Sequence, residues 1–149
     1  IGSIDVLINS AGFGLFEPFK DIEMQPVEKM FRVNVLGLMY VTQKIAQQMI
    51  KMGRGQIFNI ASVAGKIATP KSTAYSATKF AVIGFSNALR LELRPLGVQV
   101  TTVNPGPMDT NFFKRADPSG HYFDAVKLLA LSPEKVANQI VEAVCYRSR

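Results

Sequence analysis

The sequence predicts an α/β fold with a parallel sheet, and two observations lead to this prediction. Three short apolar runs, rich in β-branched residues, cover residues 4–9, 56–61 and 98–104. Two long helical patterns, residues 27–52 and 73–94, lie between them. An order of strand, helix, strand, helix, strand is typical of parallel βαβ units with right-handed crossovers.

Each element is supported by its own residues. The three runs look apolar on both faces, as strands buried in a parallel sheet do. The first helix is expected to end at the Gly-Arg-Gly stretch, residues 53–55, because glycine commonly terminates helices. Ser72 is the expected N-cap of the second helix, which Pro95 and Gly97 end. A last helix is expected over residues 133–146, since a serine precedes a proline at its first position.

Length and composition indicate one globular domain over residues 1–149. Apolar residues make up 48% of the chain and charged residues 19%. The net charge of +6 comes from scattered basic residues interleaved with acidic ones, without zinc-finger spacing or a basic helix. We therefore expect neither nucleic acid nor a metal as a ligand. The longest apolar runs are too short to span a bilayer, so no transmembrane segment is expected.

The single cysteine, Cys145, cannot form an internal disulfide, which fits a reducing compartment. The first residues show no charged-then-apolar leader with a small-residue cleavage site. We therefore expect an intracellular, cytoplasmic protein. The chain begins at Ile1 and not at a methionine, which indicates a piece of something longer.

Small, polar and glycine residues follow all three predicted strands. They read Asn-Ser-Ala-Gly at residues 9–12, Ile-Ala-Ser-Val-Ala-Gly at 60–65 and Asn-Pro-Gly-Pro-Met-Asp-Thr at 104–110. Ligands of open α/β sheets bind beyond the carboxyl ends of the strands, where small residues let the backbone approach them. One such loop would mean little, but three at the same edge favour a ligand site there.

Tyr75 and Lys79 lie one turn apart in the second predicted helix, so both side chains emerge on one face. A phenol with its ordinary pKa of about 10 exchanges protons poorly at neutral pH. A nearby ammonium is expected to lower that pKa, which suits general acid–base chemistry. Ser62, after the second strand, could hold the reacting oxygen. For such residues taken alone, the alternative is a packed aromatic, a solvated charge and a turn serine.

Asn34 lies inside the first predicted helix between two valines, where asparagine is a poor helix former. A buried asparagine must find hydrogen-bond partners, and a water chain toward Lys79 would provide them. The alternative is an exposed helix residue.

In this order and spacing, the residues resemble the short-chain dehydrogenase/reductase family, the Tyr-x-x-x-Lys oxidoreductases that use a nicotinamide cofactor. Asn-Ser-Ala-Gly is similar to the family's Asn-Asn-Ala-Gly, with Ser10 as a mild departure, and Pro-Gly-Pro-Met-Asp-Thr resembles its Pro-Gly-x-x-x-Thr. Asn34, Ser62 and the tyrosine–lysine pair fall where the family has them. The resemblance covers almost the whole chain. It implies a doubly wound parallel sheet, Rossmann-like, of which the chain holds about strands 4 to 6 and their helices.

The resemblance also implies a role for each residue. Tyr75 would exchange a proton with a carbonyl or alcohol oxygen, and Lys79 would lower its pKa and hold the nicotinamide ribose. Ser62 would orient the substrate oxygen and Asn34 would anchor a water relay, while hydride passes between nicotinamide and substrate. The cofactor would be NAD or NADP, with NADP favoured. The residues implied to contact it are Asn9, Ala11, Gly12, Tyr75, Lys79, Pro105, Gly106, Met108 and Thr110.

The family's glycine-rich turn, which cradles the pyrophosphate after the first strand, has no counterpart in this chain. Gly12 and Gly14 begin a Gly-x-Gly pattern, but no third glycine follows, and we interpret the stretch as a loop. The resemblance therefore implies that the first three strands are missing and that strand 4 is an exposed edge. The choice between NAD and NADP would be made in the missing part.

The substrate would be a small carbonyl or alcohol, and three segments would select it: residues 13–19, 64–71 and 106–131, the last acting as a mobile lid. Within the lid, the His-Tyr-Phe stretch at 121–123 could face the substrate, although a loop histidine is more often solvated. Two rival hypotheses are a catalytically silent dinucleotide-binding or scaffold relative and an inactive truncated fragment.

The two long predicted helices look apolar nearly all round, which implies burial on both sides. In similar proteins they pair with their copies as a four-helix bundle. We therefore expect a homodimer or homotetramer built on helices 27–52 and 73–94.

Overall fold

The computed structural model describes residues 2–108, 110–117 and 119–147. Three parallel strands form a central sheet in the order β1 (Val6–Asn9), β2 (Gly55–Ile60) and β3 (Val98–Val103). In its register, Val6 lies opposite Gln56, and Gly55 lies opposite Val98. The carboxyl ends of all three strands therefore lie at one edge, and the predicted α/β fold with a parallel sheet is confirmed.

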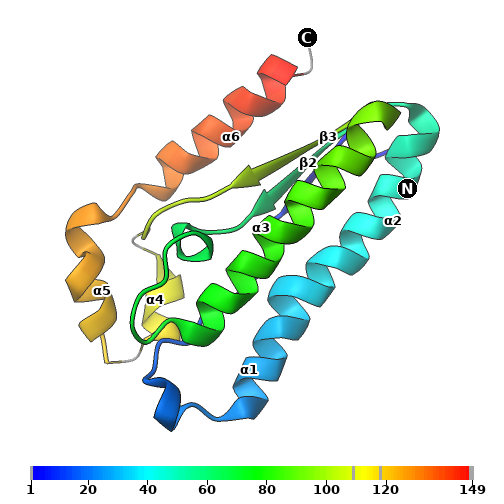
Figure 1. Cartoon of the computed structure of the whole chain (residues 1–149). Coiled ribbons are helices and arrows are strands. Elements are labelled where there is room, and N and C mark those ends of the chain that lie inside the picture. Colours follow the sequence, from blue (N-terminus) through cyan, green and yellow to red (C-terminus); the bar gives the residue numbers. More distant parts are fainter. Residues whose placement is uncertain (1, 109, 118, 148–149) are drawn as a thin grey trace.

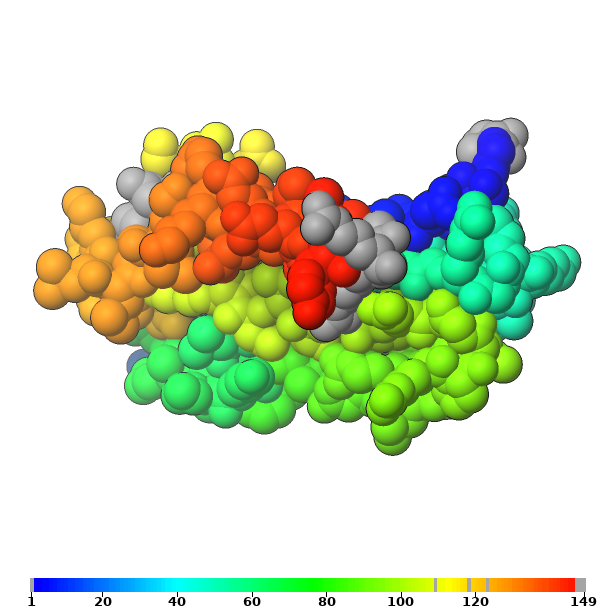
Figure 2. Space-filling view, turned by 90° about the horizontal axis from the view of Figure 1, so that it is seen from above, coloured from blue at the N-terminus to red at the C-terminus, as the bar shows by residue number. Residues whose placement is uncertain are grey.

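Helices lie on both sides of this sheet (Figure 1). One side carries α1 (Met24–Phe31), α2 (Leu38–Met52) and α3 (Thr73–Leu93). The other side carries α6 (Pro133–Arg147), and the view from above shows α6 and α3 on opposite sides of the molecule (Figure 2). Two short helices, α4 (Asn111–Ala116) and α5 (His121–Val126), lie beyond the carboxyl ends of the strands. Short 3₁₀ turns occur at Phe19–Asp21, Val63–Gly65, Arg94–Leu96 and Lys127–Leu129.

The first long helix differs from the prediction in its start and in its middle. α1 begins at Met24, upstream of the predicted residue 27, and Pro26 lies in its first turn, where a proline is tolerated. A π-helical segment, Arg32–Gly37, then joins α1 to α2. Such segments are rare and occur often at functional sites. Among the strands, β1 begins at Val6 and not at residue 4.

Ser72 occupies the N-cap position of α3, as predicted, but its hydroxyl makes no capping hydrogen bond. A capping residue typically has an extended backbone, whereas the backbone of Ser72 (φ −103°, ψ 12°) is not extended. Instead, the fully buried Oγ donates to the carbonyl oxygen of Thr69 at 2.7 Å and lies 2.9 Å from the Oγ of Ser76.

Glycines end both crossover helices, as predicted. Gly53 and Gly97 have left-handed backbones (φ 67° and 78°). A Cβ added to Gly97 would lie 2.0 Å from the carbonyl oxygen of Gly53, so the two turns touch backbone to backbone. Both turns lie at the amino ends of β2 and β3, away from the carboxyl edge of the sheet.

The main core fills the space between the sheet and α2 and α3. Its buried members are Ala46, Met49, Ile57, Leu93, Val98 and Val100. β2 is buried along most of its length, as the prediction of a doubly covered strand requires. β1 forms an edge of the sheet and leaves Ile8 48% exposed.

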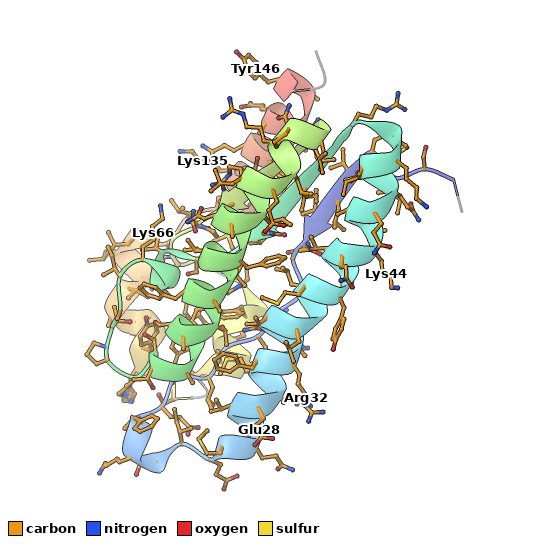
Figure 3. All side chains as sticks on the ribbon, turned by 45° about the vertical axis from the view of Figure 1, so that its right-hand side comes forward. Glu28, Arg32, Lys44, Lys66, Lys135 and Tyr146 are labelled. Carbon is orange, nitrogen blue, oxygen red and sulfur yellow. The ribbon has the colours of Figure 1, made fainter. Side chains whose placement is uncertain are left out.

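Most charged side chains lie on the outer surface of the molecule, and Lys79 and Asp117 are buried exceptions. Along α1, the π-helical segment and α2, the side chains of Glu28, Arg32 and Lys44 point outward. Lys66 and Lys135 lie on other parts of the surface (Figure 3). Among the described residues, no helix has the length and apolar character needed to cross a membrane. The same residues contain no cluster of three or more histidine, cysteine or acidic side chains that could hold a metal ion.

Candidate active site

A cavity of about 300 Å³ opens at the carboxyl edge of the sheet. The segments after all three strands line it, and so do Tyr75 and Lys79 from α3. Its lining residues from the strand ends are Ser10, Gly12, Ile60, Ala61, Ser62, Pro105, Gly106, Pro107, Met108 and Thr110. The three segments that the sequence marks as a ligand site therefore meet around one space.

Tyr75 and Lys79 lie on the cavity side of α3. Both are buried, with 8% and 7% of their surface exposed. The Nζ of Lys79 lies 5.7 Å from the centre of the Tyr75 ring and donates a hydrogen bond to the carbonyl oxygen of Ile60 at 3.0 Å. An ammonium carries three donor hydrogens, so Lys79 keeps donor capacity for a ligand in the cavity.

Ser62 follows β2 and caps the short turn Val63–Gly65. Its Oγ accepts a hydrogen bond from the Ala64 N–H at 3.1 Å and is also hydrogen-bonded to the Tyr75 phenol. Because the bond to Ser62 lowers the pKa of Tyr75, the Ser62 hydroxyl is its donor, and the two hydroxyls meet at the cavity.

The ionisation of Tyr75 differs from the prediction. Burial raises the pKa of Tyr75 to about 12, while the hydrogen bond with Ser62 acts in the opposite direction and Tyr122 adds to the rise. Burial also lowers the pKa of Lys79 to about 8. The expected net lowering of the Tyr75 pKa is therefore wrong for this structure, because burial of the phenol is the largest effect on it.

The lowered pKa of Lys79 predicts a specific pH dependence of stability in the full-length protein. Between pH 8 and 10.5 the unfolded chain holds the lysine proton and the native chain does not, so the free energy of unfolding rises with pH. Tyr75 acts with the opposite sign above pH 10, where the native state retains the proton. From pH 7.5 to 9.5, urea unfolding should show wild type gaining about 2 kcal/mol relative to Lys79→Met. Lys66→Met, at an exposed position, should follow wild type, and equal pH slopes for wild type and Lys79→Met would contradict the assignment.

Asn34 is 1% exposed, and its partners in this structure are protein atoms. Its Nδ2 donates to the carbonyl oxygen of Phe13 at 2.8 Å and to the Oγ1 of Thr78 at 3.2 Å, and its Oδ1 accepts from the Phe13 N–H at 3.0 Å. Protein atoms thus hydrogen-bond both ends of the amide, and a water relay through Asn34 stays a prediction. Through these bonds Asn34 holds the loop after β1 against α3, beside the cavity but outside its lining.

Asn9 faces a buried polar network and does not line the cavity. Its Nδ2 donates to Thr42 Oγ1 and to Asn59 Oδ1, both at 2.8 Å, and Asn59 in turn donates to Ser86 Oγ at 2.9 Å. This network joins β1, α2, β2 and α3. Ala11 is exposed and also lies outside the lining, so cofactor contact by these two residues remains a prediction.

The remaining residues expected to contact a cofactor do line the cavity: Gly12, Tyr75, Lys79, Pro105, Gly106, Met108 and Thr110. A Cβ added to Gly106 would meet nothing nearer than the Leu131 side chain at 3.9 Å, so its backbone is open to a ligand. Gly12 has less room, because a Cβ there would lie 3.0 Å from the Asn34 Oδ1.

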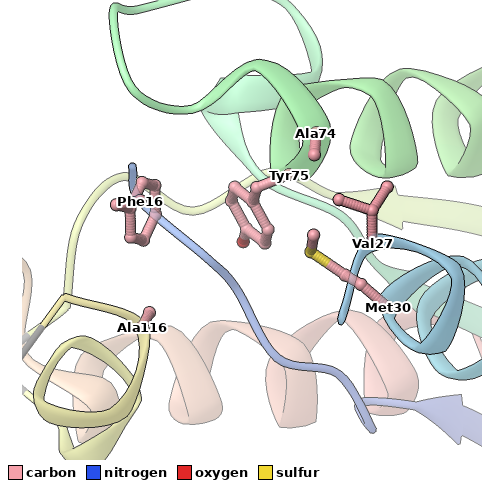
Figure 4. Packing of buried hydrophobic residues seen from close by; sticks show 6 residues of the cluster. All are labelled: Phe16, Val27, Met30, Ala74, Tyr75 and Ala116. Atoms are coloured by element: carbon pink, nitrogen blue, oxygen red, sulfur yellow. The ribbon is translucent and has the colours of Figure 1, made fainter. Parts of the chain in front are cut away.

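The segments expected to select the substrate place aromatic side chains around Tyr75, of which Tyr122 alone was singled out from the sequence. Phe16, Phe112, Phe113 and Tyr122 all line the cavity, and Figure 4 shows Phe16 beside the Tyr75 ring. The paired phenylalanines at 112 and 113 were an available signal within the expected lid. His121, by contrast, is exposed and does not line the cavity.

A parallel sheet with a cavity at its carboxyl edge defines the class of open α/β folds that bind ligands at that edge. Within this class, residues 1–119 match the family described as short chain dehydrogenase, and the chain belongs to this family.

Individual relatives agree with this membership. The probable short-chain type dehydrogenase/reductase VdlC of Helicobacter pylori strain J99 is 39% identical over 131 residues, which cover 88% of this chain and 48% of VdlC. The closed form of serine dehydrogenase complexed with NADP⁺ matches with a TM-score of 0.84 and 33% identity, over 93% of this chain and 58% of that one. NAD⁺-bound xylitol dehydrogenase matches with a TM-score of 0.71 and 34% identity, over 73% and 42%. The chain thus spans about half the length of the curated relatives it matches.

Proposed function

We propose that the protein containing this chain is an NAD(P)-dependent oxidoreductase that interconverts a carbonyl and an alcohol, with Tyr75 as the general acid and base. The observation that carries the proposal is the meeting of Tyr75, Lys79 and Ser62 at one buried cavity. Family membership supports oxidoreductase activity in general. A silent binding or scaffold protein would have no chemical need for all three groups together.

The cavity residues fit the nicotinamide end of such a cofactor. Lys79 has donor hydrogens left for ribose hydroxyls, and the backbone at Gly106 is open to close approach. Pro105, Met108 and Thr110 would complete this contact. When bound, the cofactor supplies or accepts the hydride at the substrate carbon. Because the solved relatives include both an NADP⁺ complex and an NAD⁺ complex, we propose NAD or NADP and would test NADP first.

The side chains of this chain would handle the proton. During reduction, the Tyr75 hydroxyl donates its proton to the carbonyl oxygen while the carbon receives the hydride, so an O–H and a C–H bond form as the C=O π bond breaks. The raised pKa of Tyr75 keeps it protonated and able to donate near neutral pH. Ser62 donates a hydrogen bond to the same oxygen, and the Lys79 ammonium stabilises the phenolate that remains. In the oxidative direction the phenolate takes the alcohol proton.

An assay on the full-length protein tests this proposal. With NADPH or NADH, the absorbance of the reduced nicotinamide should fall only when a ketone or aldehyde is present, and the matching alcohol should accumulate. Carbonyl-independent loss of absorbance, or no loss with any carbonyl compound, would contradict the proposal.

We propose further that the protein is a homodimer or homotetramer built on the two long helices. α2 and the π-helical segment before it leave Val33, Leu36, Tyr40 and Val41 exposed, and α3 leaves Phe80 and Leu91 exposed. Helices α2 and α3 lie side by side (Figure 1). We propose that their exposed apolar side chains pack against a second copy of the protein.

Light scattering at micromolar concentration should therefore give at least twice the monomer mass for the full-length protein. A charge placed among these apolar side chains, Val41→Asp, should shift the protein toward monomer, because an unpaired carboxylate would be buried in the interface. Leu128→Asp, at a fully exposed position outside these helices, should leave the mass unchanged. A wild-type monomer would contradict the proposal.

A further inference from the structure

The wall of the cavity beside Tyr75 is built from aromatic rings. Phe16 stands at its centre, stacked on Tyr122 with centroids 4.2 Å apart and on Phe113 at 5.7 Å. The Phe16 ring also meets the edge of Tyr75 at 5.3 Å, and Phe112 lies 5.5 Å from Tyr75. A ligand whose oxygen reaches the Tyr75 hydroxyl would therefore have ring faces and edges beside the rest of its structure.

Aliphatic side chains extend this wall to the mouth of the cavity. Ile67 is 64% exposed, Leu129 is 71% exposed and Val63 is 38% exposed, and all three line the cavity. Apolar side chains left open to solvent around a concave site indicate an apolar ligand.

The charges and hydrogen-bonding groups of the cavity lining also favour an apolar ligand. Of the described residues that line the cavity, Lys79 is the one that carries a full charge, and it lies at the end occupied by Tyr75 and Ser62. Away from that end, the Oγ1 of Thr69 is already bonded to the Tyr122 hydroxyl at 2.8 Å and to Ser72 at 3.0 Å. In that part of the cavity, a substrate rich in hydroxyl or carboxylate groups would give up hydrogen bonds to water without gaining hydrogen bonds to the protein.

The wall is held in place by bonds that do not involve a ligand. The Tyr122 hydroxyl is fixed to Thr69, and the Phe16 N–H donates to the carbonyl oxygen of Ala116 at 2.9 Å. These bonds tie α4 and α5 to the loop after β1 and to the start of α3. A preformed wall of this kind reduces the ordering cost of binding.

We propose that this wall is the substrate subsite, and that the substrate is an uncharged ketone, or the matching secondary alcohol, that carries an apolar ring or alkyl chain. The inference rests on the proposed function and adds the substrate class to it. The apolar part lies against Phe16, Phe113, Tyr122 and Leu129, and the oxygen lies at Tyr75.

Direct binding to the full-length protein tests the inference, with oxidised NADP or NAD present at saturation so that a ketone binds without being reduced. The probes are α-tetralone as a ring ketone, methyl hexyl ketone as a chain ketone, and D-fructose as a polar ketone. Calorimetric titration should show at least one apolar ketone binding about tenfold or more tightly than D-fructose. Equal affinities, or no binding of either apolar ketone, would overturn the inference.

Two neighbouring leucines provide a matched pair of variants. Leu129→Ser removes an exposed part of the wall without touching the core and should weaken binding of the preferred apolar ketone about fivefold or more. Leu128→Ser makes the same change at a fully exposed position outside the cavity lining and should leave binding unchanged. Unchanged binding by Leu129→Ser would overturn the placement of the subsite. If apolar ketones bind as expected but none is reduced with NADPH or NADH, the proposed oxidoreductase function fails and the subsite stands.

Discussion

Tyr75→Phe in the full-length protein is expected to reduce carbonyl turnover about a thousandfold, because it removes the proton donor. Cofactor affinity should stay within a few-fold of wild type. The phenylalanine keeps the ring that packs against Phe16 and Phe112, and only the hydroxyl and its hydrogen bond with Ser62 are lost. The measurement is kcat and KM for a reduced carbonyl, together with a direct titration of the cofactor.

Tyr40→Phe provides the matched control, because Tyr40 is 68% exposed on α2 and does not line the cavity. This variant should turn over like wild type. Near-normal turnover by Tyr75→Phe would remove Tyr75 from the role of acid–base group, whatever its effect on stability.

The 149-residue chain expressed alone is expected to bind NAD(P) no more tightly than about millimolar, which corresponds to roughly 4 kcal/mol. These residues contain the contacts proposed for the nicotinamide end but no glycine-rich turn with a following helix N-terminus for the pyrophosphate. The few contacts at Lys79, Gly106 and Thr110 would have to offset the cost of immobilising a large dinucleotide.

The same chain should also be poorly soluble. β1 would present an unpaired edge, with Ile8 already 48% exposed, and such an edge is a template for strand addition. Calorimetric titration of the isolated chain, with the full-length protein as the control, decides the first expectation. Micromolar binding by the isolated chain would contradict this expectation.

The sequence predicted the sheet well because each strand carries a local pattern. β2 begins at a glycine, and β3 lies between Gly97 and Pro105, so both are short runs with local boundary signals that depend little on distant residues. The start of α1 was missed because Pro26 looks like a helix boundary, whereas a proline in the first turn is tolerated. The π-helical segment that contains Asn34 was not predicted, because the spacing of apolar residues along the helix does not reveal it.

The site was predicted less completely, because its environment comes from distant residues. The spacing of Tyr75 and Lys79 follows from helix geometry, so their placement on one wall was foreseeable. Their pKa values were not, since the burial that raises one and lowers the other depends on rings contributed by α4, α5 and the loop after β1. The partners of Asn34 were hidden for the same reason, because Phe13 and Thr78 become its neighbours only after folding.

The contact between Gly53 and Gly97 has a consequence for how this domain can change. A Cβ at Gly97 would lie 2.0 Å from the carbonyl oxygen of Gly53, so a side chain at Gly97 would push the two turns apart. At the opposite end of the sheet, exposed side chains such as Ile67 and Leu129 can be replaced without disturbing the core. The contact between the two turns therefore lies at the opposite end of the sheet from the proposed substrate subsite. Substitutions at the mouth of the cavity can therefore change the proposed substrate preference while the contact between Gly53 and Gly97 is kept.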